Sequence, residues 1–588
     1  MSARLSRRGP DGHSALRFDY TADQSGDMST TAPFASEKRP FIELHGYLLA
    51  MRGLLPQPLV SRNPSGVVDR AIVWNGESFR APFIPSIECL GVTNESSIGD
   101  ESDTLQVFDL LSRSSVMDGL SQIEGPWATV YYSKVDHRIY FGRDPRGRRS
   151  LMVGKVGSDY LLISSIPWRS NGLLIDWIEV DTKGIYNVDL KSSIIALEPW
   201  KAEISDLAQR SVIVPPDGVS GLSDEFILKE LMAVLRLSVR RRVHFRGDHK
   251  RLTISATSSS AGDGDMTVSS LDTVSAPVAV LFSGGLDSTV LAALVDKELP
   301  LKLPIDLINV AFGSESQTSS APDRITCLQS YEDLCVASPR RAWRMILVNI
   351  SKDELEQCTP EVAALMYPNN TLMDISISAP LWFASRAVGV STVNASDRFI
   401  LKAHGHIVSQ KRASPPATTD NKDVDIHTEQ ETGYQEEEEE KELVPFTSRA
   451  KVLLVGAGAD EQFAGYGRHR VSYRKGGWEG LQQELDKDIK RLWKRNLGRD
   501  DRVLSDHGKE ARFPFLDADV MHWISSRYLS ELCDMELPPG EGDKRALRLV
   551  AHQLGLKAAS VLPKRAIQFG TKITKQMPKG KGTDNFEA

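Results

Sequence analysis

Residues 1–210 contain short runs of apolar and β-branched residues that are separated by turn residues. Runs of this length and composition are typical of β-strands. The expected strands cover residues 41–51, 71–74, 128–132, 138–142 and 160–164. Strands that follow one another without helices between them favour antiparallel pairing, so the pattern predicts an antiparallel, sandwich-like N-terminal domain.

The pattern changes from residue 277 onward, where compact apolar runs alternate with stretches of helical periodicity. Strands alternating with helices are typical of an α/β domain with a doubly wound parallel sheet. We therefore predict such a domain over residues 277–588. The expected strands are 278–282, 305–312, 345–350 and 451–455, and the expected helices are 289–296, 376–388 and a core-packed helix over 481–493.

Residues 211–276 are predicted to connect the two domains through a helix at 226–239 and a disordered Ser/Gly-rich linker. Residues 19–38, 252–276 and 409–448 are polar and of low complexity, and such segments bury too little apolar surface to fold. The segment 409–448 would interrupt the second domain as a disordered acidic insert, so its two ends must lie close together.

Charge is concentrated in that insert. The chain has 71 Lys and Arg against 78 Asp and Glu, a net charge of −7. Residues 411–442 alone hold four basic and eleven acidic residues, so the remainder of the chain is neutral overall. A neutral body lacks the basic excess of a nucleic-acid-binding protein. We therefore expect small-molecule partners and no nucleic acid.

Composition narrows the class of protein further. Hydrophobic residues make up 41% and charged residues 25%, as in ordinary globular proteins. No apolar run approaches the ~18 residues of a membrane helix, and no apolar core follows the basic N-terminal residues, so neither a membrane partner nor a secretory signal is expected. The five cysteines are scattered without CxxC spacing, which opposes a zinc site and favours reduced thiols in the cytoplasm.

The strongest motif is Ser-Gly-Gly-Leu-Asp-Ser at residues 283–288, between an apolar strand and a helix. Gly284 and Gly285 allow a tight turn and a close approach of the backbone to an anion, and the helix N-terminus favours phosphate. The Ser283 and Ser288 hydroxyls can donate to phosphate oxygens, and Asp287 can hold Mg²⁺. A Gly-Lys-Ser/Thr sequence is missing, so this is not a Walker A loop.

This loop resembles the pyrophosphate loop of the N-type ATP pyrophosphatases, which cleave ATP between the α- and β-phosphates. The segment Gly-Ala-Gly-Ala-Asp-Glu-Gln-Phe-Ala-Gly-Tyr, from Gly456 to Tyr466, resembles that of asparagine synthetases. The resemblance implies that Gly456 contacts nucleotide and that Asp460 is a second Mg²⁺ carboxylate with a catalytic role. Pro-Lys-Arg at 563–565 matches the region of the family's catalytic lysine, which implies that Lys564 stabilises charge on the phosphates.

The N-terminal region is similar to the class II glutamine amidotransferase domain of the same family. Trp-Asn-Gly-Glu resembles its oxyanion segment, which implies that Asn75 and Gly76 bind the amide carbonyl of glutamine. Asp103 matches the residue that binds the glutamine amino group. Arg-Gly-Pro-Asp at 8–11 and Arg-Asp-Pro-Arg-Gly at 143–147 also match the family, so the resemblance covers nearly the whole chain. Its N-terminal fold would then be an incomplete Ntn-type α+β sandwich.

Two departures from the family pattern affect the chemistry. The family nucleophile is an N-terminal Cys, whereas this chain begins Met1-Ser2 and its first cysteine is Cys89. We therefore expect the first strand and its nucleophile to be missing, which leaves glutaminase activity in doubt and makes the glutamine-binding residues vestigial or conditional. Ala457 stands where asparagine synthetases have Glu, so acid–base assistance from this position is lost.

Three functions remain open. The first is an ATP- and Mg²⁺-dependent asparagine synthase that adenylates a carboxylate, most simply the aspartate side chain, and amidates it with free or glutamine-derived ammonia. The second is an ATP-binding, asparagine-synthetase-like protein with weak or no turnover and a regulatory role. The third is another adenylating enzyme, such as a tRNA-modifying sulfur transferase, which the neutral body and scattered cysteines oppose. A homodimer is one candidate assembly.

Overall fold

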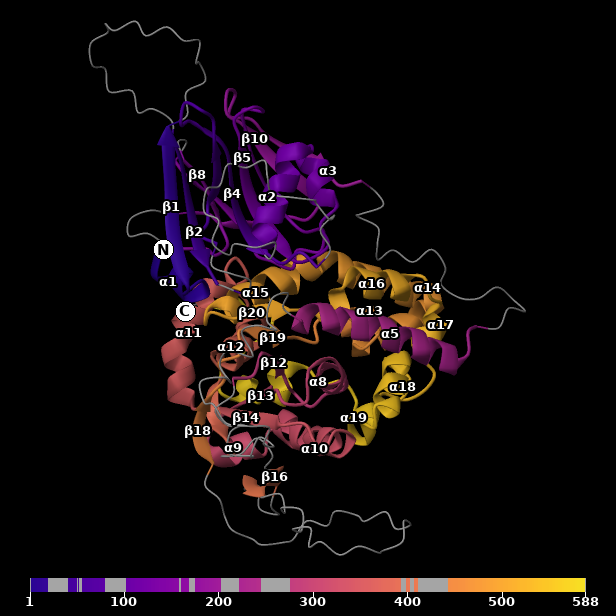
Figure 1. The fold of residues 1–588 in the computed structure, drawn as a ribbon. Helices are drawn as coiled ribbons and strands as arrows, with labels where there is room; N and C mark the ends of the chain where they lie inside the picture. Colours follow the sequence, from indigo (N-terminus) through magenta and orange to yellow (C-terminus); the bar gives the residue numbers. More distant parts are fainter. Residues whose placement is uncertain are drawn as a thin grey trace, which may run out of the picture.

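The protein consists of a β-rich N-terminal part and a larger α/β part, stacked on one another in the computed structural model (Figure 1). The described residues are 2–19, 41–49, 51, 55–79, 102–157, 160–168, 175–201, 221–244, 275–392, 398–401, 407–410 and 443–586. Among them, no helix combines the length and the apolar character that a bilayer crossing requires.

The N-terminal part is built on a six-stranded antiparallel sheet with the order β11-β10-β6-β5-β4-β3. One face of it packs against helices α2 and α3 through Trp74, Trp127 and Tyr131. The predicted strands 71–74, 128–132 and 138–142 are confirmed within this sheet. The elements are β3 (Leu59–Arg62), β4 (Val68–Gly76), α2 (Asp103–Arg113), α3 (Val116–Ser121), β5 (Trp127–Ser133), β6 (Arg138–Arg143), β10 (Gly184–Asp189) and β11 (Ile195–Pro199).

The opposite face of this sheet is covered by a second antiparallel layer. The sheet β8-β7-β9 and the hairpin β1-β2 form that layer, and Val153 and Ile163 pack against Phe141 between the layers. The predicted antiparallel sandwich is therefore confirmed, with two outer helices that the strand pattern did not predict. The elements are β1 (Gly12–Asp19), β2 (Phe41–Leu48), β7 (Met152–Val156), β8 (Tyr160–Ser164) and β9 (Ile178–Glu179).

The α/β part has a seven-stranded sheet with the order β18-β15-β14-β13-β12-β19-β20. Five neighbouring strands, β14 to β20, are parallel, and β15 and β18 add an antiparallel edge. All eight residues of β13 are buried, as expected for a strand covered on both faces. The strands are β12 (Val278–Leu281), β13 (Ile305–Phe312), β14 (Trp343–Ile350), β15 (Val388–Ser391), β18 (Val444–Thr447), β19 (Val452–Leu454) and β20 (Glu510–Arg512).

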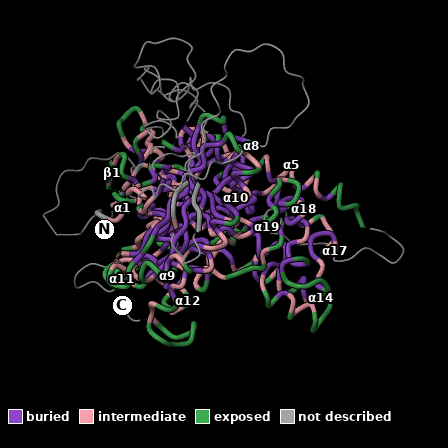
Figure 2. The backbone as a smooth tube through the Cα atoms, turned by 90° about the horizontal axis from the view of Figure 1, so that it is seen from below, coloured by how far each residue is buried: buried purple, intermediate pink, exposed green. Residues whose placement is uncertain are grey.

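Helices cover both faces of this sheet. The interior between them is buried, as the purple core in Figure 2 shows. Val278 and Val280 point into one apolar core with α5, α8, α10 and α18, and Ala279 points into the other with α11, α12 and α15. The predicted doubly wound arrangement is thus confirmed. The helices are α5 (Asp224–Val243), α8 (Leu286–Glu298), α10 (Pro322–Ala337), α11 (Lys352–Met366), α12 (Leu372–Arg386), α15 (Gly498–Ser505) and α18 (Arg545–Gln553).

Shorter or peripheral elements complete the described structure. The long helix α14 contains two non-helical glycines, Gly476 and Gly477, and its C-terminal half buries Leu481, Leu485 and Leu492, which confirms the predicted core helix. The remaining elements are α1 (Ser2–Arg8), α9 (Glu315–Ser319), β16 (Arg398–Leu401), β17 (Ile407–Gln410), α13 (Ala459–Gln462), α14 (Gly467–Leu492), η1 (Trp493–Leu497), η2 (Pro514–Leu516), α16 (Ala518–Ser525), α17 (Leu529–Leu532), α19 (Lys557–Val561), α20 (Ile567–Gly570) and η3 (Ile573–Lys575).

The predicted insert 409–448 is wrong at both ends. Residues 409 and 410 belong to β17, and β18 pairs with β15 at the sheet edge. Strand β18 has only four alternating residues beside the long glutamate run, which is too short a pattern to predict a strand. Ser391 pairs with Val444, so the chain leaves the sheet and returns to it at one edge, as expected for an insertion. That residues 409 and 448 themselves lie close together stays a prediction. The rest of the insert (411–442), residues 20–38 and residues 252–274 lie outside the described residues.

Element boundaries required two smaller corrections. The predicted helix 376–388 ends at Arg386, because Ala387 adopts a left-handed conformation with φ of 55° and the chain then enters β15. The predicted strand 41–51 ends at Leu48.

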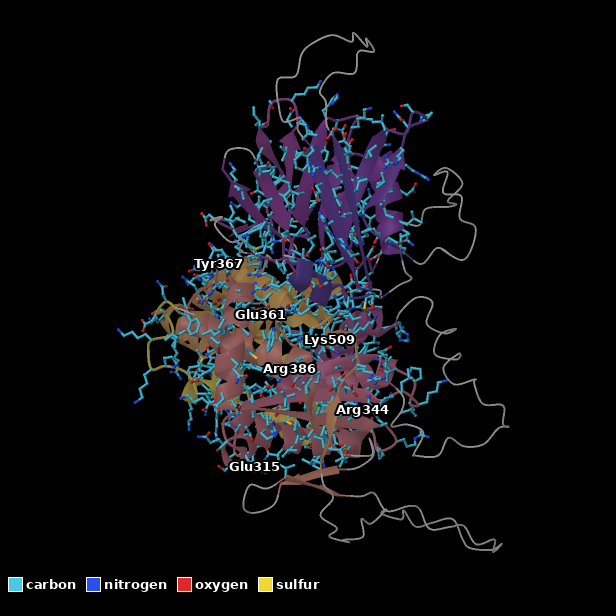
Figure 3. All side chains as sticks on the ribbon, turned by 90° about the vertical axis from the view of Figure 1, so that its left-hand side faces the viewer. Glu315, Arg344, Glu361, Tyr367, Arg386 and Lys509 are labelled. Carbon is cyan, nitrogen blue, oxygen red and sulfur yellow. The ribbon has the colours of Figure 1, made fainter. Side chains whose placement is uncertain are left out.

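Buried ion pairs join the N-terminal part to the α/β part. Arg149 contacts Asp501 at 3.3 Å and Glu510 at 3.0 Å, and Arg502 contacts Glu179 at 3.2 Å. Helix α1 adds further pairs, since Arg8 binds Asp501, and Arg4 and Arg7 bind Glu361 of α11 near the boundary (Figure 3). Charged pairs of this kind, removed from water, fix the relative placement of the two parts.

Asp144, in the segment 143–147, and Arg512 both have structural roles near this boundary. Asp144 accepts hydrogen bonds from the backbone N–H groups of Arg146 and Arg148 and closes the turn that follows β6. Arg512, which sequence reasoning left open between ligand binding and internal pairing, is buried and pairs with Glu510 and Glu77.

Candidate functional site

The Ser-Gly-Gly-Leu-Asp-Ser loop joins the end of β12 to the start of α8. Gly284 has φ of 76°, and a Cβ there would lie 2.3 Å from the backbone N and Cα of Cys327. From α10, Ser330 Oγ donates to the Gly284 carbonyl at 2.6 Å and Thr326 Oγ1 donates to the Ser283 carbonyl at 3.2 Å. Glycine is therefore required at 284, and α10 holds the loop in place.

Replacing Gly284 by alanine is expected to lower the free energy of unfolding by about 2–4 kcal/mol, because the new Cβ meets backbone in a left-handed conformation. Gly66→Ala is the matched control. Gly66 has φ of 79° but no atom within 4 Å of an added Cβ, so its cost should stay near ~1 kcal/mol. Urea denaturation of both variants measures the difference, and equal losses would show that the contact with Cys327 is unimportant.

The serine hydroxyls of the loop face one another. Ser283 Oγ accepts from the Gly285 N–H at 3.3 Å, Ser288 Oγ donates to the Gly285 carbonyl at 3.1 Å, and the two hydroxyl oxygens are 3.5 Å apart. Both line a small cavity of about 60 Å³ together with Asp287. The predicted phosphate-binding residues are therefore gathered at one point, with hydroxyl and N–H donors as an anion site requires.

Four charged side chains form a compact cluster beside this loop, named here the ion quartet: Asp287, Asp460, Lys544 and Lys564. Lys544 Nζ lies 2.7 Å from both carboxylate oxygens of Asp287 and 2.6 Å from Asp460 Oδ1. Lys564 Nζ lies 2.6 Å from Asp460 Oδ2. The structure thus brings together the three residues predicted from the sequence and adds Lys544, which sequence reasoning missed.

The sheet topology explains why these residues meet. Strands β12 and β19 are parallel neighbours, so the segments that follow their carboxyl ends lie side by side. Asp287 and Asp460 stand in the first turns of the helices that begin there, α8 and α13. Two glycines leave room for the carboxylates. A Cβ on Gly456 would lie 3.1 Å from the Asp287 Cβ, and one on Gly465 would lie 2.1 Å from Asp460 Oδ1. Gly456, predicted to contact nucleotide, therefore borders the ion quartet.

Lys544 occupies an unusual position at the start of a helix. It precedes α18, has φ of 55°, and its side chain is only 3% exposed. A cation at a helix N-terminus is electrostatically unfavourable, and a left-handed conformation is uncommon for lysine. Such local conflicts are expected at functional sites. In the sequence, a lysine directly before an amphipathic helical pattern was therefore the feature that could have marked Lys544 as a candidate site residue.

The electrostatics of the cluster favour the charged forms. Burial alone would raise the pKa of Asp460, but the ammonium groups of Lys544 and Lys564 outweigh burial and hold that pKa well below its usual value. Burial alone would lower the pKa of Lys564, but the carboxylates of Asp460 and Asp287 together outweigh burial and raise that pKa, so the ammonium form is stabilised. Asp460 and Lys564 therefore hold each other in their charged forms.

The site residues fit a Mg²⁺–nucleotide complex. Carboxylate oxygens are the protein ligands that Mg²⁺ usually takes beside phosphates, and Asp287 and Asp460 converge on one ammonium group at 2.6–2.7 Å. Asp287 and Asp460 would hold the metal ion, and the loop N–H and hydroxyl groups would hold the phosphates.

Asp323, at the start of α10, lines the same small cavity and was not predicted as a site residue. Burial raises the pKa of Asp323 to about 7, and the ammonium and guanidinium groups of Lys564 and Arg565 offset this only in part. Arg565 Nη1 is 4.0 Å from the carboxylate, and a Cβ on Gly570 would lie 2.0 Å from it. The cavity therefore contains one carboxyl group that titrates near neutral pH.

Stability should depend on pH through Asp323. Because burial raises the pKa of Asp323 in the native state, this state keeps a proton that the unfolded chain releases. The protonated carboxyl group therefore contributes its full stabilisation of the folded state below about pH 4, and this stabilisation is lost as pH rises through about 7. Asp323→Asn does not titrate. The free energy of unfolding of the variant minus that of the wild type should therefore rise by up to ~4 kcal/mol between pH 4 and pH 8. A constant difference in urea denaturation across this range would contradict the raised pKa.

Glu461, next to Asp460, has a separate role. Burial and the neighbouring Asp460 carboxylate raise the pKa of Glu461 to about 7, and Tyr466 Oη donates to Glu461 Oε1 at 2.7 Å. The Tyr466 ring in turn lies 5.9 Å from Lys564 Nζ. Glu461 thus orients the tyrosine that packs beside Lys564.

The residues predicted to bind glutamine also meet. Asn75 and Gly76 at the end of β4 and Asp103 at the start of α2 line a cavity of about 1670 Å³. Asp103 Oδ2 accepts from the Ser78 N–H at 3.1 Å, and Asn75 Nδ2 is buried without a hydrogen-bond partner among the described residues. Asn75 therefore keeps a donor that a ligand could use. No cysteine is among the described residues that line this cavity.

The same cavity reaches the α/β part at Lys509. Lys509 lies near the boundary between the two parts (Figure 3) and donates to the carbonyls of Ser448 and Ala450 at 2.8 and 2.6 Å. Burial lowers the pKa of Lys509 to about 8. The carbonyl contacts tie this lysine to the edge of the seven-stranded sheet.

Comparisons with known proteins show which family the chain is similar to. The asparagine synthase family model matches residues 269–394 and 471–577. Asparagine synthetase domain-containing protein 1 of Homo sapiens is 31% identical over 95% of this chain and 91% of its own length. The Mus musculus protein of that name is 32% identical over 90% of this chain and 89% of its own length.

More distant comparisons cover less of the chain. A putative glutamine-hydrolysing asparagine synthetase of Methanocaldococcus jannaschii is 36% identical over 21% of this chain and 27% of its own length. A solved Bacillus subtilis glutamine phosphoribosylpyrophosphate amidotransferase covers 43% of this chain and 64% of its own at 13% identity, with a TM-score of 0.20 that carries no argument. The matches along nearly the full length show that the chain belongs to the asparagine synthetase family, in the branch of asparagine synthetase domain-containing protein 1.

Proposed function

We propose that this protein is an ATP-dependent ligase that adenylates the carboxylate of an acidic substrate, most simply the side chain of aspartate, and converts it into an amide. The observation that carries the proposal is the ion quartet, which places two carboxylates and two ammonium groups beside a phosphate loop. This combination suits the transfer of an adenylyl group, where negative charge builds up on a departing pyrophosphate.

The first step joins substrate and nucleotide. A carboxylate oxygen of the substrate attacks the α-phosphorus of ATP, the bond to the β-phosphate breaks, and pyrophosphate leaves with the electron pair. The loop N–H groups and the Ser283 and Ser288 hydroxyls hold the β- and γ-phosphates. Lys544 and Lys564 stabilise the charge that develops on pyrophosphate, and Mg²⁺, held by Asp287 and Asp460, neutralises phosphate charge when bound.

The second step replaces AMP by nitrogen. Ammonia attacks the acyl carbon of the acyl adenylate, the bond to the phosphate oxygen breaks, AMP leaves, and the nitrogen loses a proton. Ala457 supplies no acid–base group for that proton. In the N-terminal cavity, Asn75, Gly76 and Asp103 are proposed to bind glutamine or a related amide, with no assigned nucleophile.

A direct test is pyrophosphate release from ATP in the presence of Mg²⁺, aspartate and ammonium. The proposed activity requires release that depends on both aspartate and ATP, with asparagine as the product. Ala457 supports a second function, in which the site binds ATP with little or no turnover. Binding of α,β-methylene-ATP without any pyrophosphate release from ATP would favour that second function.

A further inference from the structure

The formal charges of the ion quartet sum to zero without any ligand. Two carboxylates and two ammonium groups balance one another, and every charged group in it contacts an opposite charge at 2.6–2.7 Å. Lys544 is the central member, because its single ammonium group contacts both Asp287 and Asp460, whereas Lys564 contacts Asp460 alone.

A divalent cation that binds without nucleotide therefore competes with the Lys544 ammonium group for the two carboxylates. To bind Asp287 and Asp460 together, it must displace the Lys544 ammonium group, whose side chain is 3% exposed. A buried charge that loses its partner carries a large free-energy cost. Adding two positive charges to a neutral, largely buried cluster increases that cost.

Nucleotide phosphates change the balance. Lys544 lines the small cavity together with Ser283, Gly285 and Ser288 of the phosphate loop. An anionic phosphate in that cavity gives the ammonium group a new partner without moving it into an apolar environment. The two carboxylates can then take up a cation that the phosphates also ligate.

We propose that Lys544 makes metal binding depend on nucleotide binding: its ammonium group holds Asp287 and Asp460 until phosphate oxygens take their place as its partners. This inference rests on the proposed function, because it assumes that the cavity receives the phosphates of a nucleotide. It adds an order of binding, in which the nucleotide phosphates enter the cavity before or together with the metal ion and the metal ion does not enter alone.

The test measures two affinities of the full-length chain. Mn²⁺ alone is titrated and free Mn²⁺ is followed by electron paramagnetic resonance, and α,β-methylene-ATP is titrated in EDTA by calorimetry. Lys544→Gln is expected to tighten binding of Mn²⁺ alone by about tenfold and to weaken metal-free nucleotide binding by about tenfold, within the usual range of coupling between sites. Opposite changes in the two affinities distinguish this role from a merely structural one.

A matched control is Lys579→Gln, which removes the same charge from an exposed lysine and should change neither affinity. Unchanged or weaker Mn²⁺ binding by folded Lys544→Gln overturns the inference. If circular dichroism shows that this variant is unfolded, the wild type decides the question. Mn²⁺ binding as tight without nucleotide as with it overturns the inference, and weak binding of Mn²⁺ alone supports it. Failure of the wild type to bind α,β-methylene-ATP under any condition would instead refute the proposed function.

Discussion

Replacing Asp460 by asparagine is expected to reduce pyrophosphate release from ATP by about 10²–10³-fold, the loss that follows removal of one well-placed electrostatic group from a transition state. Asp460 contacts both lysines of the ion quartet, and its carboxylate is the point where Lys544 and Lys564 converge. A carboxamide is a poorer Mg²⁺ ligand and leaves Lys564 without its charged partner.

The measurement is initial-rate pyrophosphate release with ATP, Mg²⁺, aspartate and ammonium. Asp353→Asn is the control, because it makes the same chemical change at an exposed position on α11 and should retain the wild-type rate. Circular dichroism verifies that both variants are folded. A folded Asp460→Asn protein with more than half of the wild-type rate would exclude Asp460 from the chemistry.

Replacing Arg512 by alanine is expected to lower the free energy of unfolding by about 3–5 kcal/mol, as when one member of a buried charge network is removed. Arg512 is 1% exposed. Its guanidinium contacts Glu510 at 2.6 Å and Glu77 at 3.1 Å, and it donates to the Arg242 carbonyl at 2.6 Å. The variant leaves two carboxylates without this guanidinium partner, the buried Glu77 of the N-terminal part and the largely buried Glu510 of the α/β part.

Urea denaturation monitored by tryptophan fluorescence measures this loss. Arg449→Ala removes an exposed arginine and should change the free energy of unfolding by less than ~0.5 kcal/mol. A similarly small change for Arg512→Ala would mean that the ion pairs with Glu510 and Glu77 contribute little to holding the two parts together.

The local sequence pattern was sufficient to predict most of the secondary structure and the phosphate loop with Asp287. The strands around residues 128–132 and 305–312 were predicted because alternation and continuous apolar runs are properties of neighbouring residues. Asp287 was predicted from its own loop. Asp460 and Lys564 were predicted through the resemblance to asparagine synthetases, and the structure places all three within one cluster.

Other features depended on contacts between distant residues. Helices α2 and α3 were missed among strand-like runs, and β18 was missed because four alternating residues beside a glutamate run carry too little signal. The internal pairing of Arg512 could not be decided from its motif, since its partner Glu77 is more than 400 residues earlier in the chain.

The amino-acid sequence by itself determined the two-part organisation, the phosphate loop and the family, because each is written in short-range periodicity or in a continuous motif. Only the tertiary structure decided which cationic side chain neutralises the carboxylates beside the loop. It brought Lys544, from the start of a helix 257 residues after Asp287, between the two carboxylates. That placement follows from the parallel pairing of β12 and β19 and from the packing of α18 against α5 and α8, and no local pattern encodes which distant ammonium group will meet a given carboxylate.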